Sequence, residues 1–306
     1  MVKKNGTKQE INLISLVERY HNEDACRTYL EELRFPDGIV CPRCGSKGIS
    51  RVEKYHIFEC RSCSYQFSVI AGTIFKDTHL PLWKWFAAVY LMVESRKGIS
   101  ANQMKRTLGV SYKTAWYLCH RIRAAMTDAA IEPLLGTIEV DETYVGGKTE
   151  GMGHGYKGNK ALVVGAIERG GDATLDVIEH ADKETLHKFI HGHAAPDTVY
   201  TDEWPAYQGI KSEAVQHETV NHSADEWVKG DVHTNSVENI WSLLKRSIVG
   251  SYHQVSKKHL DAYLDELEWR FNNRQNPYLF RDTLLKLIKS QNLPYEKLVS
   301  KMHSQA

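Results

Sequence analysis

Apolar and polar positions repeat with two different periods along the second half of the chain. Apolar runs and residues that alternate predict strands at 137–141, 161–168, 173–180, 198–202 and about 214–220. A three-to-four-residue apolar period predicts helices at 182–193, near 204–212, at 236–248 and at 256–273. Three strands followed by helix, strand, helix, strand and helix predict a mixed sheet that is covered by helices.

The first half of the chain shows shorter segments of both kinds. Residues 49–59 predict a hairpin, and the alternation at 65–69 predicts a further short strand. Helical stretches are predicted at 13–34 and at 80–94, and we interpret the aromatic residues of the second as core. Two more helices are predicted on either side of Gly109, with Ser100 as the N-cap of the first and Ser111 as the N-cap of the second.

Net charge is +1, but the two halves of the chain differ in charge. Residues 1–130 contain 20 Lys and Arg against 12 Asp and Glu, whereas residues 131–306 contain 19 against 26. The basic half suits a polyanion, and the acidic half suits a site that gathers carboxylates around cations. Chance variation between domains is the alternative. The hydrophobic content of 42% is ordinary for a globular protein with a sizeable core.

Four of the six cysteines form two C-x-x-C pairs separated by fifteen residues: Cys41, Cys44, Cys60 and Cys63. This spacing is typical of a zinc ribbon, in which two tight turns direct four sulfurs at one ion. Four thiolates complete the coordination of Zn²⁺, so the predicted ion is structural. Two disulfides or a redox pair are the alternatives. The N-terminus predicts no secretory signal, which disfavours disulfides, and a redox site needs only one such pair. Cys26 and Cys119 fall in helical patterns and are interpreted as core residues.

The segment from Ser95 to Thr127 contains no Asp or Glu but has seven basic residues. Together with the glycine turn, this predicts a helix-turn-helix whose second helix enters the major groove of DNA. A helical hairpin with a solvated basic face is the alternative. The candidate DNA contacts are basic residues of both helices and residues that begin the second one: Lys105, Arg106, Tyr112, Lys113, Thr114, Arg121 and Arg123.

Three carboxylates occupy positions that can converge. Asp141 and Asp202 end predicted strands, and Glu238 lies at the start of a predicted helix. The order of elements is that of the ribonuclease H-like fold, in which the first strand, the fourth strand and a late helix meet at one site. Crowded carboxylates repel one another, and hard divalent cations relieve that repulsion. The sequence therefore predicts a site for two-metal phosphoryl transfer on a nucleic acid.

Lys245 lies seven residues after Glu238, so both side chains share a face of the predicted helix, about 10 Å apart along its axis. A lysine at this distance from a metal ligand suits a phosphodiester backbone that crosses the helix. Glu238 has an alternative role as the capping-box partner of an N-cap at Asn235.

The nearest rival carboxylates are Glu139, Glu142 and Glu203, which we interpret as supporting or exposed residues. Glu139 shares a strand face with Asp141 under simple alternation. His233 precedes the predicted helix, and it could contact a phosphate, support the site or be a buried, hydrogen-bonded residue.

The Gly-rich stretch 146–160 does not match a P-loop and is predicted to join the first two strands of the sheet. Whether it contacts DNA stays open. No run of about 18 uncharged apolar residues is present, so no membrane span or membrane partner is expected. With no signal peptide predicted, the expected location is the cytoplasm, in association with the nucleoid.

Three motifs resemble the insertion-sequence DDE transposases of the ISXO type, which carry an N-terminal zinc ribbon. They are Val140-Asp141-Glu142-Thr143-Tyr144-Val145-Gly146-Gly147, Tyr200-Thr201-Asp202-Glu203, and the stretch from His233 to Lys245, HTNSVENIWSLLK. The resemblance extends from about Asp24 to Asn276. Some relatives have Asn in place of the last acid, whereas Glu238 completes the acidic triad here.

This resemblance implies a DNA transposase that binds the terminal repeats of its element and then cleaves and joins DNA. It implies Asp141, Asp202 and Glu238 as ligands of two Mg²⁺ (or Mn²⁺) ions, and the four ribbon cysteines as ligands of one Zn²⁺. Asp141 would bridge both metal ions. The partners would be terminal repeats and target DNA, and joining two ends suggests a homo-oligomer on DNA. A catalytically silent DNA-binding regulator and a structure-selective nuclease of the same fold are the rival functions.

Together these features predict a multidomain α+β protein. Its segments are an N-terminal helical segment (1–35), a zinc ribbon (36–75), a helix-turn-helix region (80–128), a ribonuclease H-like mixed-sheet catalytic domain (133–285) and a C-terminal tail (286–306).

Overall fold

The computed structural model describes residues 11–127, 132–146, 160–210, 215–220 and 232–300. The chain forms two compact units. The first, here called the helical unit, comprises residues 1–95, 99–126 and 275–306, and the second, the sheet unit, comprises residues 96–98 and 127–274. The predicted sheet domain ended at residue 285 and was followed by a separate tail. In the structure the chain instead returns to the helical unit from residue 275 on.

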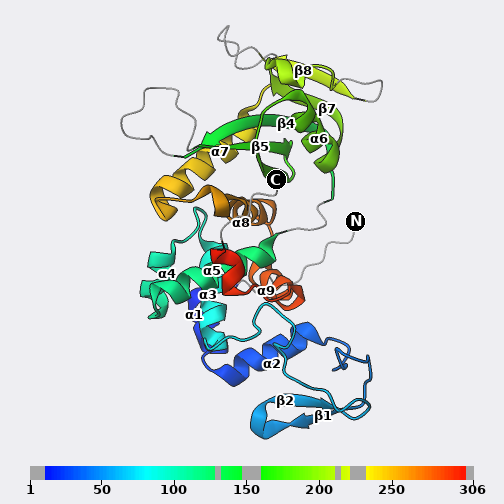
Figure 1. The fold of residues 1–306 in the computed structure, drawn as a ribbon, viewed down its shortest axis with the longest axis vertical. Helices are drawn as coiled ribbons and strands as arrows, with labels where there is room; N and C mark the ends of the chain where they lie inside the picture. The colour runs from blue at the N-terminus through cyan, green and yellow to red at the C-terminus, as the bar shows by residue number, and fades with distance from the viewer. Residues whose placement is uncertain (1–10, 128–131, 147–159, 211–214, 221–231, 301–306) are drawn as a thin grey trace. The chain divides into compact units, whose positions relative to one another are not determined.

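The helical unit combines a small sheet with helices from both ends of the chain (Figure 1). Its elements are α1 (Leu13–Arg19), α2 (Glu23–Arg34), β1 (Ile49–Val52), β2 (Ile57–Cys60), β3 (Gln66–Phe67), α3 (Leu82–Glu94), α4 (Ala101–Leu108), α5 (Tyr112–Met126), α9 (Leu279–Lys289) and α10 (Tyr295–Val299). Helix α3 is central and contacts α2, α4, α5 and α9. Its aromatic residues Trp85 and Phe86 are buried, as the sequence predicts, whereas Trp83 is 41% exposed and is not a core residue.

Helices α4 and α5 form the predicted pair around a glycine turn. The Ser100 side chain caps α4 by accepting a hydrogen bond from the Gln103 amide at 3.1 Å. Gly109 ends α4 with φ +60°, which is the left-handed conformation that favours glycine. Ser111 accepts from the Thr114 amide at 3.1 Å and so caps α5. All three local predictions are confirmed.

The sheet unit is built on one five-stranded mixed sheet in the order β6-β5-β4-β7-β8. Its elements are β4 (Leu134–Val145), β5 (Ala161–Glu168), β6 (Ala173–Ile178), α6 (Lys183–His193), β7 (Ala194–Asp202), β8 (Gln216–Val220), α7 (Asn235–Ser247) and α8 (Leu260–Asn272). Strands β4, β5 and β6 are antiparallel neighbours, and β7 pairs parallel to β4, as β8 does to β7. This is the predicted ribonuclease H-like mixed sheet.

Helices cover both faces of this sheet, and each face has its own core (Figure 1). Leu186, Phe189 and Ile190 of α6 pack against residues of β4, β5 and β7 on one face. On the other face, Val237, Ile240 and Trp241 of α7 join residues of α8, β5 and β6. The predicted helix near 204–212 does not form in its described part, residues 204–210: that part contains a 3₁₀ turn at Pro205–Tyr207, and Gly209 follows with φ +86°.

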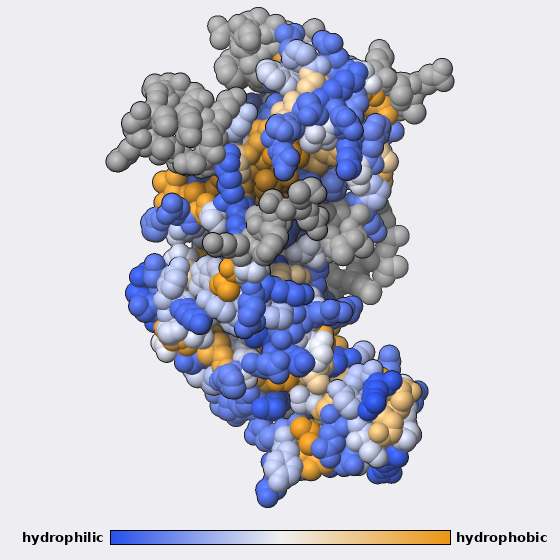
Figure 2. Space-filling view, viewed as in Figure 1, coloured by the Kyte–Doolittle hydropathy of each residue, from blue (hydrophilic) through white to orange (hydrophobic). Residues whose placement is uncertain are grey.

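Hydrophilic side chains dominate the face of the molecule drawn in Figure 2, and apolar side chains gather only in small patches there. Among the residues that the structure describes, no helix has the length and apolar character needed to span a bilayer.

Candidate active site and metal centre

The sheet register places the carboxylates of Asp141 and Asp202 on neighbouring strands. Strands β4 and β7 run parallel, and their last paired residues are Glu139 and Tyr200. Asp141 and Asp202 each lie two residues further along, on neighbouring strands that are about 4.8 Å apart. Asp202 ends β7, as predicted. The prediction that Asp141 also ends its strand is wrong, because β4 continues to Val145 and Asp141 pairs with Gly165 of β5. The sequence predicted this convergence from the element order alone.

Asp141 is the carboxylate whose electrostatics link all three predicted acids. Burial raises its pKa to about 6, and the negative charges of Asp202 and Glu238 contribute to the rise. A hydrogen bond from Trp241 opposes part of it. Asp141 therefore lies near both other acids, in an environment that disfavours an uncompensated negative charge. A closer cluster of ligand atoms lies elsewhere in the described chain.

That closer cluster is the set of four ribbon cysteines. The four Sγ atoms all lie within 4.8 Å of one another. In the described part of the chain, this is the cluster of His, Cys, Asp or Glu side chains that is close enough to hold one metal ion. The oxygens of Asp141, Asp202 and Glu238 are less tightly gathered.

Trp241 attaches α7 to the first strand at the acid itself. Its indole nitrogen donates to Asp141 Oδ2 at 2.8 Å. The indole ring lies over Gly165 of β5, which pairs with Asp141, and a Cβ atom at Gly165 would approach the ring to 2.6 Å. No role for Trp241 or Gly165 was predicted from the sequence. A glycine inside an apolar strand is a signal of such a close approach.

Glu238 is exposed on α7, three residues before Trp241. The capping-box alternative for this residue is wrong, because Thr234 is the N-cap and no side chain caps the helix from that position. Thr234 Oγ1 instead donates to Glu238 Oε1 at 3.5 Å. Local helix capping therefore does not account for Glu238.

Glu139 is fully buried, and this residue, not Glu238, caps the start of α7. Its Oε2 accepts from the amides of Ser236 at 2.7 Å and Val237 at 3.2 Å. His233 lies beside it, with Nδ1 at 3.2 Å from Glu139 Oε1, but this nitrogen makes no hydrogen bond within the described chain.

Glu142 is a fourth carboxylate near the strand ends. Burial raises its pKa to about 7, and the charges of Asp141 and Asp202 add to the rise. The Tyr207 hydroxyl donates to Glu142 Oε2 at 2.5 Å. Tyr207 is fully buried and comes from the turn after Asp202, so this bond connects β4 to the segment that follows β7. Glu203, the third rival, is exposed.

Lys245 lies on α7 near its C-terminal end and is exposed, like Glu238. Seven residues along a regular helix place the two side chains on one face, about 10 Å apart along the axis. The arrangement expected from the sequence is therefore present, and the role of Lys245 stays a prediction. The Gly-rich stretch 146–160 lies almost entirely outside the described residues.

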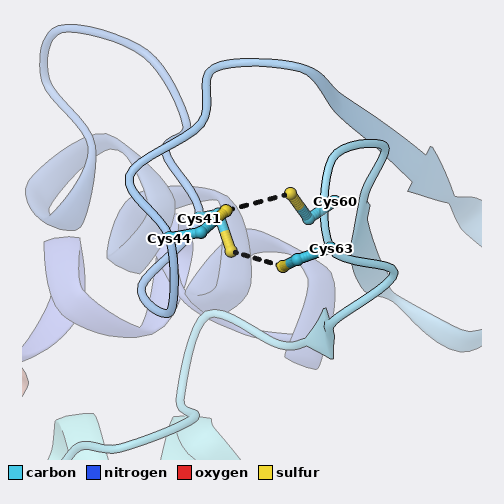
Figure 3. A group of neighbouring side chains, drawn as sticks. All are labelled: Cys41, Cys44, Cys60 and Cys63. Carbon is cyan, nitrogen blue, oxygen red and sulfur yellow. Dashed lines mark hydrogen bonds between the residues drawn. The ribbon is translucent and has the colours of Figure 1, made fainter.

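The ribbon cysteines converge as the spacing predicts (Figure 3). Cys41 Sγ lies 3.7 Å from Cys63 Sγ, and Cys44 Sγ lies 3.6 Å from Cys60 Sγ. The Gly45 amide donates to the Cys41 carbonyl, and the Ser64 amide donates to the Cys60 carbonyl in the same way. Both turn residues have a positive φ, so the two pairs form equivalent turns. Four thiols gathered in this way match the donor set of a structural zinc site.

The candidate DNA-contacting residues separate into two groups. Lys105, Arg106, Tyr112 and Lys113 are exposed, and Thr114 is half-buried. Arg121 and Arg123 are only 3% and 2% exposed, so these two predictions are corrected. The Arg121 guanidinium donates to the carbonyls of Ile74 and Lys76 and lies over the Trp85 ring. A charge in the sequence does not reveal that aromatic rings and carbonyls will enclose it.

A C-terminal strap, residues 292–295, covers one side of α5. The Tyr117 hydroxyl donates to the Leu293 carbonyl at 2.6 Å, and Arg121 donates to the Asn292 side chain at 3.0 Å. Lys113 Nζ lies 4.4 Å from the centre of the Tyr295 ring. Only the first turn of α5 and the exposed face of α4 therefore offer candidate DNA contacts within the predicted motif.

Two protein families match separate parts of the chain, one in the sheet unit and one around the ribbon cysteines. Residues 133–272 match the model of the ISXO2-like transposase domain, and residues 21–66 match that of the transposase zinc-ribbon domain. The chain is also 30% identical to an uncharacterized protein in transposable element ISH50 of Halobacterium salinarum, over 83% of this chain and 92% of the relative. The chain belongs to the ISXO2-like transposases.

Other similar proteins match a smaller part of the chain or match it at much lower identity. A transposase-like protein of Haemophilus influenzae is 31% identical over 32% of this chain and 80% of its own length. The strand transfer complex of Mos1 aligns with 67% of this chain and 75% of its own at 11% identity, with a TM-score of 0.28. The Mos1 mariner paired-end complex with Mn gives 10% identity, the same coverages and a TM-score of 0.29. Likenesses this weak support no assignment.

Proposed function

We propose that the chain is an active transposase that binds the terminal repeats of its element and catalyses DNA cleavage and strand transfer. One observation carries this proposal: Asp141 lies beside Asp202 and close to Glu238, in surroundings that raise its pKa to about 6. A DNA-binding regulator has no use for three acids held in this way. Family membership supports the same function.

The donor set of this site fits hard divalent cations. Carboxylate oxygens are the ligands that Mg²⁺ and Mn²⁺ prefer, and crowding of negative charge is what such ions relieve. Asp141, Asp202 and Glu238 would hold two of these ions. When bound, two metal ions activate the attacking oxygen and stabilise the leaving oxygen of an in-line displacement.

The side chains around the acids have separate tasks in this proposal. Trp241 donates to Asp141 Oδ2 and so orients the carboxylate that would hold the cations. Lys245 would contact a phosphate of the DNA strand that crosses α7. Lys105, Arg106, Lys113, Tyr112 and Thr114 would hold the terminal repeat, with the positive residues contacting phosphates. The ribbon zinc would maintain the fold of the first DNA-binding segment.

The test uses the purified full chain with DNA that contains an element end, in Mg²⁺ and separately in Ca²⁺. We expect binding in both ions, and nicking and joining only in Mg²⁺. Joining is scored separately with pre-cut ends. Binding without nicking would favour the regulator and overturn the proposal, and cutting without joining would favour a nuclease.

A further inference from the structure

Glu139 is completely buried and forms an ion pair with Arg169. The proposed reaction does not account for this residue. Besides the two amides at the start of α7, its carboxylate accepts from the Ser236 hydroxyl at 2.9 Å and from Arg169 Nε at 3.0 Å. A buried carboxylate with this many donors is held in one place, because loss of any partner would leave charge unsatisfied. The question is what that fixed position determines.

The carboxylate completes a helix that does not cap itself. The first amides of an α-helix have no partner within the helix, and a negative charge there is favourable. Thr234, at the N-cap, offers no side-chain bond to them. Glu139 supplies both the acceptor and the charge from β4, so the cap of α7 is also an attachment of α7 to the first strand.

Glu139 and Asp141 lie two residues apart on β4, about 6.6 Å along the strand, and both contact α7. Glu139 binds Ser236 and Val237, and Asp141 binds Trp241. Glu238 lies between these two attachment points on the helix. A helix attached at both points cannot slide along the strand or rotate, so the height of Glu238 over Asp141 is set by this pair of contacts.

Arg169 extends the cluster to the third acid-bearing element. Its guanidinium lies 4.5 Å from the ring centre of Tyr200, and it donates to the His233 carbonyl at 3.3 Å. Tyr200 pairs with Glu139 across the sheet and precedes Asp202 by two residues on β7. One buried cluster therefore contacts β4, β7 and the start of α7, each close to the acid that the element carries.

We propose that Glu139 is a positioning residue for the catalytic triad, and that with Arg169 it sets the spacing of Asp141, Asp202 and Glu238 before metal binds. This inference rests on the proposed function. Glu139 itself contacts neither DNA nor metal in this account. Its loss would weaken metal binding and slow cleavage, and DNA binding by the helical unit would be unchanged.

The test is Glu139→Gln in the full chain, which keeps the shape of the side chain and removes its charge. We expect single-turnover cleavage of end-containing DNA to slow at least tenfold, and half-maximal rate to need at least threefold more Mg²⁺. DNA binding should stay within twofold. The matched control is Val164→Ala, which removes buried volume from the opposite face of the sheet. The control should lower the melting temperature but leave the Mg²⁺ midpoint unchanged.

Two further variants separate positioning from stability. In Glu139→Gln/Ser236→Asp a carboxylate within α7 restores the charge at the helix start without the link to β4, so the melting temperature should recover while cleavage stays slow. Arg169→Lys keeps the positive charge but loses the hydrogen bond from Arg169 Nε to Glu139. This variant replaces Glu139→Gln as the test if Glu139→Gln does not fold. The same rise in the Mg²⁺ concentration for half-maximal rate is expected.

The inference is overturned if cleavage recovers together with stability in the double variant, or if Glu139→Gln or its Arg169→Lys substitute keeps the wild-type Mg²⁺ midpoint. Failure of the wild-type chain to cleave would count against the proposed function instead, so the two failures are distinguishable.

Discussion

At the scale of single residues, the environment of Asp141 determines what the site can do. Its carboxyl is desolvated, lies near two other acids and accepts hydrogen bonds from the Trp241 indole and the Glu142 amide. Burial and like charge favour the protonated form, whereas the indole donor favours the ionised form. The same carboxyl therefore binds a proton or a cation readily, and Trp241 shifts that balance toward the cation.

Trp241→Phe tests this role, because it keeps a ring over Gly165 and removes the donor. We expect cleavage to slow about tenfold, since a hydrogen bond to a charged group contributes on the order of 1.5–3 kcal/mol. Without the donor the pKa of Asp141 rises further, so the acid limb of the pH–rate profile should move to higher pH. Trp269→Phe, in α8, is the control and should leave the profile in place. An unshifted profile in Trp241→Phe would refute the role.

Stability of the metal-free protein should depend on pH through Asp141 and Glu142. Their folded pKa values, about 6 and about 7, lie above those of ordinary carboxyls. Groups with a raised folded pKa stabilise the fold at low pH, and this contribution is lost as pH rises through about 4 to 7. Mg²⁺ takes the place of the protons, so the rise in melting temperature on adding Mg²⁺ should be larger at pH 8 than at pH 5.

Thermal unfolding at both pH values, with and without Mg²⁺, measures this effect. In Asp141→Asn/Glu142→Gln the metal-free stability should fall much less with pH, and Mg²⁺ should have little effect. An equal Mg²⁺ effect at pH 5 and pH 8 in the wild-type chain would contradict the assignment of a cation site around Asp141.

At the scale of elements, the sequence predicts which strands and helices form better than it predicts what touches them. The strand at 161–168 is predicted to the residue, because it is a continuous apolar run between turn residues. The helix near 204–212 fails, because Pro205 and Gly209 limit the segment to one turn. Strand order made the meeting of Asp141 and Asp202 predictable. The burial of Glu139 and Arg121 was not predictable, since each depends on partners far away in the chain.

The packing of the C-terminal strap against α5 could not be predicted from the sequence. Tyr295→Ala removes the ring beneath Lys113, and we expect binding of terminal-repeat DNA to weaken about two- to fivefold, as a cation–π contact contributes about 0.5–1 kcal/mol. Tyr295→Phe keeps the ring and should bind like the wild type. Electrophoretic mobility shift at fixed salt measures both, and equal affinity of the Ala and Phe variants would refute a role for the strap.

The zinc ribbon is the element whose prediction needs no knowledge of distant contacts, because both C-x-x-C turns are local. Metal analysis should find about one zinc per chain. Cys60→Ser should lose that zinc and weaken DNA binding, because the four thiolates stabilise the small sheet. The stabilisation of the sheet unit by Mg²⁺ should persist in this variant. Substantially less than one zinc per chain in the wild type would contradict the assignment.

At the scale of the whole molecule, the basic and acidic halves correspond broadly to two units with different proposed tasks. The helical unit offers exposed basic side chains on α4 and α5 and a candidate zinc site. The sheet unit carries the three acids, and a buried cluster around Glu139 attaches their elements to one another. Variants of one unit should therefore separate DNA binding from cleavage, and this separation is the main consequence of the proposed function.

The most direct measurement compares Asp202→Asn with Glu203→Gln, two neighbouring changes at the end of β7, in cleavage of terminal-repeat DNA with Mg²⁺. Asp202 belongs to the proposed metal site, whereas the exposed Glu203 does not. We predict that Asp202→Asn abolishes cleavage while binding stays within a few fold, and that Glu203→Gln cleaves at close to the wild-type rate. Mg²⁺-dependent cleavage that survives in Asp202→Asn would contradict the metal site and with it the proposed function.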